Sequence, residues 1–361
     1  MIEIIYFDDS QDDRDKYATR LRKAHLRVTA LAPPKSFDLK AIKRQSPDLF
    51  LVDYELTKAR SKEEHVNYFG GTLGTALREV FPGHPIALLT RRNLVSQPGY
   101  RQLNEIKQAF DELLYKDEIE ASPTLTGKRL TSLASGFSVL RGLRNKNWAS
   151  LVRSLKANPV EANSLLTTGP PFVDPHEPGS PQWRVQEAAR WIRRVVLHYP
   201  GVLYDELHAS AALGIDVKSF KGRRLQKFFS AAEYEGVFSE SEKRWWRNRL
   251  FDRAQTVVAK AGVSAPANTA FAPAFRKVFE VSLKPAICVS SGTKFADCVC
   301  YVLRKPVKRE FSLPYHPDDR PSSMDEARVS FKAIRESNRV SEELFDEQNQ
   351  ALLEQIRDGK K

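Results

Sequence analysis

The segment Ile4-Ile5-Tyr6-Phe7-Asp8-Asp9 joins a short apolar run to two adjacent carboxylates. Three later apolar runs also end in a polar side chain, at Asp53 after residues 49–52, at Thr90 after 86–89 and at Lys116 after 113–115. Between these runs, residues 14–26 and 71–80 have the apolar spacing of amphipathic helices. Strand-like and helix-like segments therefore alternate, which predicts a doubly wound α/β fold with a parallel sheet.

The polar residues that end these runs are expected to meet in space. In a parallel α/β sheet the carboxyl ends of the strands open on one edge, so residues far apart in sequence converge there. Carboxylate oxygens are the ligands that Mg2+ prefers. An aspartate can attack phosphorus once a metal ion and a lysine neutralise the charge that repels a phosphate donor. The pattern therefore predicts a divalent-cation pocket with a phosphoryl acceptor.

This order of residues resembles the receiver domain of two-component response regulators, over about residues 1–125. The resemblance implies a five-stranded parallel sheet in which Asp8, Asp9 and Asp53 hold Mg2+. It also implies that Asp53 takes a phosphoryl group from a histidine kinase or a phosphotransfer protein. Thr90 and Lys116 would then bind the phosphoryl oxygens, Thr90 as a switch hydroxyl.

Three single positions and one insertion depart from the family pattern, namely Arg91, Leu113, Asp117 and residues 57–67. Receivers usually place a small residue after the switch hydroxyl, an aromatic residue three places before the lysine and a proline after it. The bulky Arg91 is expected to cover Asp53 partly or to pair with it. These departures leave open a pseudo-receiver adaptor, which would bind a protein partner without phosphorylation.

The length of 361 residues allows two or three domains. No apolar stretch approaches the length of a membrane span, and the chain starts with a strand-like segment rather than a signal sequence. We therefore expect a cytoplasmic protein without a membrane partner. The three cysteines, Cys288, Cys298 and Cys300, cluster in one late segment, which argues against a disulfide framework.

The positive charge is concentrated after the receiver-like region. Residues 1–125 hold 19 Lys+Arg and 19 Asp+Glu, so the entire net charge of +12 lies in residues 126–361. This balance favours association with phosphate polymers or acidic protein surfaces. The expected order of the remaining segments is a helical connector at 126–157, a Pro/Gly-rich linker at 158–182 that cannot sustain a helix, and a basic, mainly helical output region at 183–361 with a small β segment near 286–313.

Residues 205–229 fit a helix-turn-helix pattern, with a first helix at 207–213, a turn at Gly214 and a basic recognition helix from Val217. The candidate contacts to DNA or RNA are Lys218, Lys221, Arg223, Arg224, Lys227, Arg244 and Arg247. A recognition helix normally buries an aliphatic residue where Arg223 stands. An ordinary helical hairpin with solvated basic residues, or a protein-binding domain, therefore stays open.

Three further sequence patterns lead to structural predictions for the region after residue 183. Trp245 and Trp246 are expected on a helix over residues 239–261, one in the core and one at its edge. The cysteines are expected to be small core residues, with a zinc site that includes His316 as the alternative. Residues 323–326 form a capping-box pattern that predicts a long helix, or a pair of helices broken near Asn338.

No phosphate-binding glycine loop, nucleophile elbow or metalloprotease helix follows the receiver-like region. The sequence therefore predicts a response-regulator-like signalling protein whose receiver controls a basic output region, and nothing requires an enzyme beyond phosphoryl transfer to the receiver. The adaptor is one alternative. An effector with an unrecognised output, such as a nuclease or a defence protein, is another, and a homodimer is left open.

Overall fold

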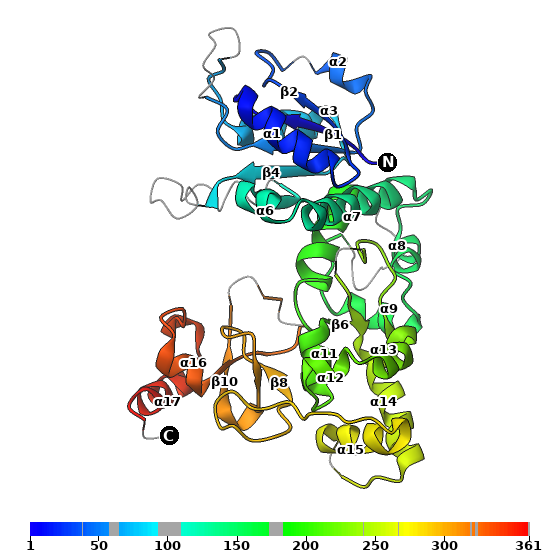
Figure 1. The fold of residues 1–361 in the computed structure, drawn as a ribbon, viewed down its shortest axis with the longest axis vertical. Helices are drawn as coiled ribbons and strands as arrows, with labels where there is room; N and C mark the ends of the chain where they lie inside the picture. Colours follow the sequence, from blue (N-terminus) through cyan, green and yellow to red (C-terminus); the bar gives the residue numbers. More distant parts are fainter. Residues whose placement is uncertain are drawn as a thin grey trace. The chain divides into compact units, whose positions relative to one another are not determined.

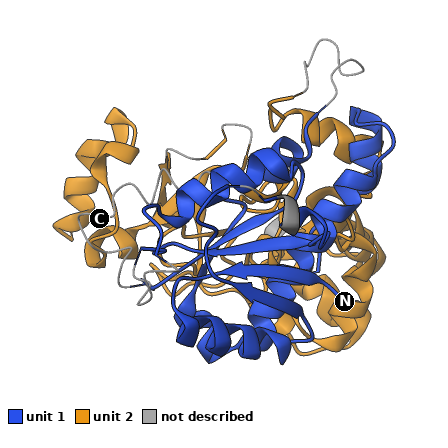
Figure 2. Cartoon of the chain, turned by 90° about the horizontal axis from the view of Figure 1, so that it is seen from above, with its two compact units in different colours: residues 1–154, 178–190, 237–241 blue, residues 155–177, 191–236, 242–361 orange. Residues whose placement is uncertain are grey.

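The computed structural model describes residues 1–37, 39–57, 65–92, 110–172, 183–240, 242–265, 267–317, 320–321 and 324–359. The chain divides into two compact units, shown in two colours in Figure 2. Unit 1 consists of Met1–Ser154, Pro178–Arg190 and Val237–Ser241, and unit 2 of Leu155–Glu177, Trp191–Gly236 and Glu242–Lys361. The predicted domain limits stay predictions. Within the described part of the chain, no helix is both long and apolar enough to cross a membrane.

Unit 1 is built on one parallel sheet (Figure 1). Its strands are β1 (Glu3–Phe7), β2 (Arg27–Leu31), β3 (Leu49–Asp53), β4 (Ile86–Thr90) and β5 (Glu112–Tyr115). They lie in the order β2-β1-β3-β4-β5, and every neighbouring pair is parallel. This is the flavodoxin-like form of the doubly wound fold, so the predicted fold class is confirmed. All four predicted strands form, and β2 is the one that completes the sheet.

The register of the sheet determines which site residues lie side by side at the ends of neighbouring strands. Phe7 is level with Val52, so Asp8 follows β1 beside the end of β3. Asp53 is level with Leu89, and Thr90 with Tyr115. Because the strands are parallel and nearly in step, the residues that end them reach one edge.

Helices cover both faces of this sheet. The main ones in unit 1 are α1 (Gln11–Arg22), α2 (Lys40–Lys43), α3 (Gly70–Val80), α6 (Lys116–Ala121), α7 (Pro123–Gly142) and α8 (Trp148–Ser154). Alternate residues of a strand face opposite sides, and one side packs Phe50, Val52 and Leu88 against Leu73 and Leu77 of α3. Helix α1 packs on β1, β2, α6 and α7. The two predicted helices are therefore present, and the predicted stretch 126–157 is divided between α7 and α8.

A short returning segment completes unit 1. Val237–Ser241 belongs to unit 1 although it lies far along the chain. The ring of Phe238 lies so close to Gly136 of α7 that a Cβ there would stand 2.1 Å from it. The Ser132 hydroxyl donates a hydrogen bond to the Phe238 carbonyl (3.3 Å). The absence of a side chain at Gly136 therefore makes room for this aromatic ring.

The prediction that residues 158–182 cannot sustain a helix is wrong for the first part, where Pro159–Leu166 forms α9. Proline is well suited to the first position of a helix, because its missing N–H would have no partner there. Asn158 and Glu161 form a capping box, and Arg249 of unit 2 donates to both oxygens of Glu161 at 2.6 Å. The part of the expected linker at 173–182 lies outside the described residues.

The first part of unit 2 is helical. It contains a π-helix, η2 (Ile192–Val196), followed by α11 (Glu206–Ala212), α12 (Val217–Phe220), α13 (Arg223–Phe229), α14 (Arg247–Ala261) and α15 (Ala267–Phe279). Helix α11 and the turn at Gly214, with φ of 66°, follow the helix-turn-helix expectation. The expected continuous recognition helix is wrong, because it breaks at Lys221 and Gly222, and Gly222 caps the start of α13.

The two adjacent tryptophans are not helical, contrary to prediction. Trp245 and Trp246 form strand β7, which pairs with β6 (Leu203–Tyr204), and α14 begins at the next residue. Successive side chains of a strand point to opposite faces, and both indoles are buried, at 1% and 0% exposure. Both therefore fill core space, and neither is available to stack on a base.

The second part of unit 2 contains short strands and two helices. These are β8 (Cys298–Val299), β9 (Pro306–Val307), β10 (Ser312–Tyr315), β11 (Ala327–Ser330), α16 (Phe331–Glu336) and α17 (Glu347–Arg357). The expected β segment is present, and so is a pair of helices interrupted around Asn338. The expected helix start at residues 323–326 is wrong, because the chain first pairs β11 with β10; Ser323 itself lies outside the described residues.

Gly70→Ala is expected to destabilise the protein by about 1–3 kcal/mol, because overpacking a tight contact costs this much. A Cβ at Gly70 would lie 2.1 Å from the carbonyl oxygen of Asp53, and backbone cannot move aside as a flexible side chain can. Urea unfolding of the full chain measures the change. Gly142→Ala is the matched control, because nothing lies within 4 Å of its Cβ position. Equal effects of the two substitutions would contradict the contact.

Candidate functional site

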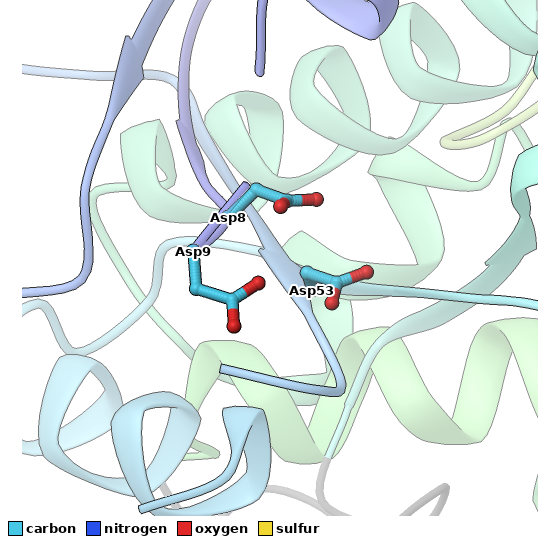
Figure 3. Close-up of side chains that lie close together, drawn as sticks. All are labelled: Asp8, Asp9 and Asp53. Carbon is cyan, nitrogen blue, oxygen red and sulfur yellow. The ribbon is translucent and has the colours of Figure 1, made fainter. Parts of the chain in front are cut away.

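Three carboxylates meet at the carboxyl edge of the sheet. Asp8 and Asp9 follow β1, and Asp53 ends β3 (Figure 3). Ligand atoms of all three lie within 4.8 Å of one another, and no other group of this kind occurs in the described ranges. All three residues are buried, with exposed fractions of 0%, 6% and 4%. The convergence expected from the sequence is therefore present.

Asp8 is held in place from three sides. Its Oδ2 accepts a hydrogen bond from the Tyr6 hydroxyl at 2.5 Å, and its Oδ1 accepts one from the backbone N–H of Ser10 at 2.8 Å. The Lys116 ammonium donates to Oδ2 at 3.0 Å. Burial and the Asp8 and Asp53 charges raise the pKa of Tyr6 well above its ordinary value, so its hydroxyl stays a donor.

Lys116 connects the carboxylates. Its Nζ lies 2.9 Å from Oδ1 of Asp53, 3.0 Å from Oδ2 of Asp8 and 2.8 Å from Oδ2 of Asp13. Burial lowers the pKa of Lys116, but the Asp53 and Asp8 charges outweigh burial and hold the pKa above its ordinary value. The ammonium is therefore a permanent cation inside this site.

Asp13 is a site residue that the sequence analysis missed. It lies in the first turn of α1, where the Ser10 hydroxyl accepts a hydrogen bond from its backbone N–H. Burial raises the pKa of Asp13, but Lys116 and Arg91 outweigh burial and lower it overall. The available signal was its position in a helix that begins directly after the Asp8-Asp9 pair, which brings its first turn to the sheet edge.

The buried Asp53 carboxylate is electrostatically strained. Burial and the nearby Asp8 charge raise its pKa well above the ordinary value, although Lys116 acts in the opposite direction. Its Oδ2 accepts a hydrogen bond from the backbone N–H of Glu55 at 3.0 Å. A second cation beside Asp53 would lower this repulsion.

The donor set fits Mg2+. The residues Asp8, Asp9 and Asp53 offer carboxylate oxygens, which this small hard cation prefers. Asp8 and Asp53 also contact the Lys116 ammonium, as does Asp13, so one positive charge faces three carboxylates. The resulting surplus of negative charge favours a divalent cation.

Thr90 and Arg91 flank this edge. The Thr90 side chain is buried, and its hydroxyl has no hydrogen-bond partner in the described part of the chain. Arg91 does not form the expected ion pair with Asp53. Its side chain is 59% exposed, and its guanidinium pairs instead with Asp13 in the first turn of α1 at 3.3 Å. Leu113 lies in β5, and Asp117 pairs with Arg92 at 3.0 Å.

The zinc alternative is wrong for the described residues. Cys288, Cys298 and Cys300 do not form a metal-binding group with His316. The Cys298 thiol donates to the Val307 carbonyl at 3.1 Å, and burial and Asp297 raise its pKa to about 12. Cys288 and Cys300 are buried among apolar side chains, so they are core residues as expected.

The candidate nucleic-acid contacts lie in two places in unit 2. Lys218, Arg223 and Lys227 are exposed on α12 and α13. Lys221 pairs with Glu206 at 2.6 Å, and the Arg224 guanidinium donates to the Phe279 carbonyl. The other two line a separate cavity, where Arg244 pairs with Glu242 and Arg247 with Asp325. Three of the seven residues are therefore exposed without an ion pair in the described part of the chain, and the other four contact carboxylates or a backbone carbonyl.

Lys116→Met is expected to lower the free energy of unfolding by about 3–5 kcal/mol near pH 7, because it leaves buried carboxylates without their cation. The deficit is expected to shrink toward about pH 4, where protonation relieves the repulsion in the variant. Urea unfolding across pH measures both. Lys16→Met is the control, because its pair with Glu120 is exposed and contributes about 1 kcal/mol or less. A pH-independent deficit would contradict the electrostatic role of Lys116.

Comparisons with known proteins place the similarity in the N-terminal third of the chain. No family model matches, and no curated protein matches. A receiver domain from Clostridium thermocellum is 15% identical with a TM-score of 0.27, and covers 38% of this chain and 94% of its own. The BeF3-activated receiver of Klebsiella pneumoniae RstA is 22% identical with a TM-score of 0.27, and covers 37% and 97%.

A third structure, response regulator TrrA of Thermotoga maritima in complex with Mg2+ and BeF, is 20% identical with a TM-score of 0.25 and covers 34% of this chain and 95% of its own. These scores are low, so the assignment of the fold rests on the sheet itself. Its five parallel strands in the order β2-β1-β3-β4-β5 match the receiver fold. The N-terminal part of this chain therefore has the fold of response regulator receiver domains.

Proposed function

We propose that this chain is a response-regulator-like signalling protein in which Asp53 accepts a phosphoryl group and thereby controls a basic output region. The observation that carries the proposal is the meeting of Asp8, Asp9, Asp53 and Lys116 in one buried site. A carboxylate nucleophile, a set of metal ligands and a fixed cation are the parts that phosphoryl transfer to aspartate requires.

In the proposed reaction an oxygen of Asp53 attacks the phosphorus of a phosphohistidine on a kinase or phosphotransfer protein. The new O–P bond forms as the N–P bond breaks, and the imidazole nitrogen keeps the electron pair and takes up a proton. When bound, Mg2+ would neutralise charge on the phosphoryl oxygens. The Lys116 ammonium lies 2.9 Å from Asp53, so in the proposed reaction it neutralises negative charge first on the carboxylate and then on the phosphoryl group.

Thr90 is the proposed switch. Its buried hydroxyl lacks a hydrogen-bond partner among the described residues, and a phosphoryl oxygen on Asp53 would provide an acceptor. An unsatisfied buried hydroxyl costs about 1–3 kcal/mol, so a new bond to it favours the phosphorylated conformation by a similar amount. This gain would bias a two-state equilibrium of the surface near β4 and β5.

The proposed output is contact with DNA, RNA or an acidic protein partner. Its support is the net charge of +12, which lies entirely beyond residue 125, and the exposed Lys218, Arg223 and Lys227 on two neighbouring helices. Positive charge of this kind attracts phosphate polymers without specifying a sequence.

A second candidate is an adaptor that is never phosphorylated. It is favoured by Lys116, which already bridges Asp8, Asp13 and Asp53 and so neutralises part of the charge that would attract a metal ion. In this case the partner would bind equally to the wild type and to Asp53→Asn.

Incubation with Mg2+ and acetyl phosphate is expected to add one phosphoryl group to the wild type and none to Asp53→Asn, because the amide is not a nucleophile. Intact-mass spectrometry measures the adduct. Asp48→Asn is the matched control, because this residue directly precedes the same strand at the opposite edge, and it should be phosphorylated normally. If the wild type forms no adduct and binds no Mg2+, phosphoryl transfer to Asp53 is excluded and the adaptor is the remaining candidate function.

Charge reversal at Arg223 and Lys227 is expected to weaken binding to nucleic acid. It should also make the negative slope of log affinity against log salt concentration shallower, by about 0.9 for each lost phosphate contact. Fluorescence anisotropy with a labelled duplex measures both. Lys260→Glu with Lys294→Glu makes the same change in net charge at exposed positions elsewhere in unit 2. If both pairs of substitutions had the same effect, the α12–α13 surface would not be the contact.

A further inference from the structure

The candidate metal site contains a buried hydroxyl group that the proposed phosphoryl transfer does not use. Tyr6 belongs to β1 and lies two residues before Asp8, and side chains two positions apart along an extended chain share a face. Tyr6 is fully buried, at 0% exposure, and its hydroxyl donates to Oδ2 of Asp8 at 2.5 Å. A phenylalanine ring would fill the same space, so packing explains the ring but not the hydroxyl.

The Asp8 carboxylate has little free capacity to bind a cation. A carboxylate has two oxygens with two lone pairs each. Oδ2 of Asp8 accepts hydrogen bonds from the Tyr6 hydroxyl and the Lys116 ammonium, and Oδ1 accepts one from the backbone N–H of Ser10. Among the described residues these bonds occupy three of the four lone pairs. The remaining lone pair is on Oδ1.

Lys116 is not free to leave Oδ2 of Asp8. An ammonium group has three N–H donors, and the Lys116 ammonium contacts three carboxylates, Asp8 at 3.0 Å, Asp13 at 2.8 Å and Asp53 at 2.9 Å. Asp13 and Asp53 therefore hold the ammonium beside Asp8. As long as Tyr6 also donates to Oδ2, both lone pairs of this oxygen stay occupied.

Asp53 is less fully bonded than Asp8. Its Oδ1 contacts the Lys116 ammonium, and its Oδ2 accepts one hydrogen bond from the backbone N–H of Glu55. Each oxygen of Asp53 therefore keeps one lone pair in the described part of the chain. The acceptor can bind a cation through one oxygen and present the other to phosphorus, whereas Asp8 can bind a cation through Oδ1 only.

Binding through a single oxygen suits a small cation better than a large one. Mg2+ takes roughly six ligands in near-octahedral geometry and keeps several waters, whereas Ca2+ takes roughly six to eight oxygens, often with both oxygens of one carboxylate. An Asp8 that offers only Oδ1 cannot bind in the second manner. The hydrogen bonds to Oδ2 therefore disfavour the larger ion.

We propose that Tyr6 is a positioning residue whose hydrogen bond to Oδ2 leaves Asp8 to bind a cation through Oδ1 alone, so that the site selects Mg2+ over Ca2+. This inference rests on the proposed function, because it concerns the cation that phosphoryl transfer to Asp53 requires. Residues that orient a metal ligand typically change metal affinity by about 10- to 100-fold when they are replaced. Tyr6 acts through Asp8 and has no contact of its own with the cation.

Isothermal titration calorimetry of the full chain with MgCl2 and with CaCl2 tests the proposal. The wild type is expected to bind Mg2+ more tightly than Ca2+. Tyr6→Phe keeps the ring and removes the hydroxyl, and it is expected to weaken Mg2+ binding about tenfold but Ca2+ binding less than about threefold. The difference arises because the freed lone pair lets Oδ2 contribute to the larger ion. Tyr6→Leu is the second variant in case Tyr6→Phe fails to fold.

Tyr17→Phe is the matched control. Tyr17 is also a buried tyrosine of unit 1, and its hydroxyl donates to the Glu120 carboxylate at 2.8 Å, but Glu120 is outside the group formed by Asp8, Asp9 and Asp53. This variant should bind both ions as the wild type does. The proposal is overturned if the wild type binds no Mg2+ or prefers Ca2+, if Tyr6→Phe binds Mg2+ normally, or if it loses affinity for both ions by the same factor.

Incubation of the same proteins with acetyl phosphate separates this inference from the proposed function. If Tyr6→Phe loses its preference for Mg2+ but the wild type forms no phosphoryl adduct, Tyr6 has the proposed role and phosphoryl transfer to Asp53 is contradicted. If the wild type forms the adduct and Tyr6→Phe binds both ions as the wild type does, phosphoryl transfer is supported and the role of Tyr6 is contradicted.

Discussion

The buried ammonium group of Lys116 is the constraint on which unit 1 depends. Transferring several carboxylates out of water is tolerated only when a cation with good geometry faces them, and Lys116 contacts Asp8, Asp13 and Asp53 at about 3 Å. These partners come from β1, α1 and β3, while the lysine directly follows β5. A slip of one residue in the register of β1, β3 or β5 would separate Lys116 from one of these buried carboxylates. The ion pairs at this edge of the sheet therefore form only when the strands are in the correct register.

The sequence predicted this half of the molecule well because its central strands are buried on both faces. Residues 49–52 and 86–89 are continuous apolar runs, and this is what a buried parallel strand requires. The edge strand β2, Arg27–Leu31, has exposed positions and gave no such signal. Asp13 could not be identified from spacing, because its role depends on how the first turn of α1 folds over the sheet edge.

The prediction was less accurate for unit 2, because its short elements leave little periodicity in the sequence. Trp245 and Trp246 lie among residues with helical spacing, and a strand of two residues has no periodicity to reveal it. Gly222 divides the basic helix because it caps the start of α13, and the apolar spacing continues across the break through Phe220, Leu225 and Phe229. The arginine-lined cavity draws on residues more than a hundred positions apart, so only tertiary packing brings them together.

The return of Val237–Ser241 to unit 1 has a consequence for how such a protein can be inherited. In a tandem arrangement, recombination can move a domain as one continuous stretch of gene. Here a fragment ending at Ser154 would lack Phe238, and the space over Gly136 that receives its ring would open to water. Unit 1 is therefore not one continuous stretch of the chain, and a cut at Ser154 would remove part of the packing on α7.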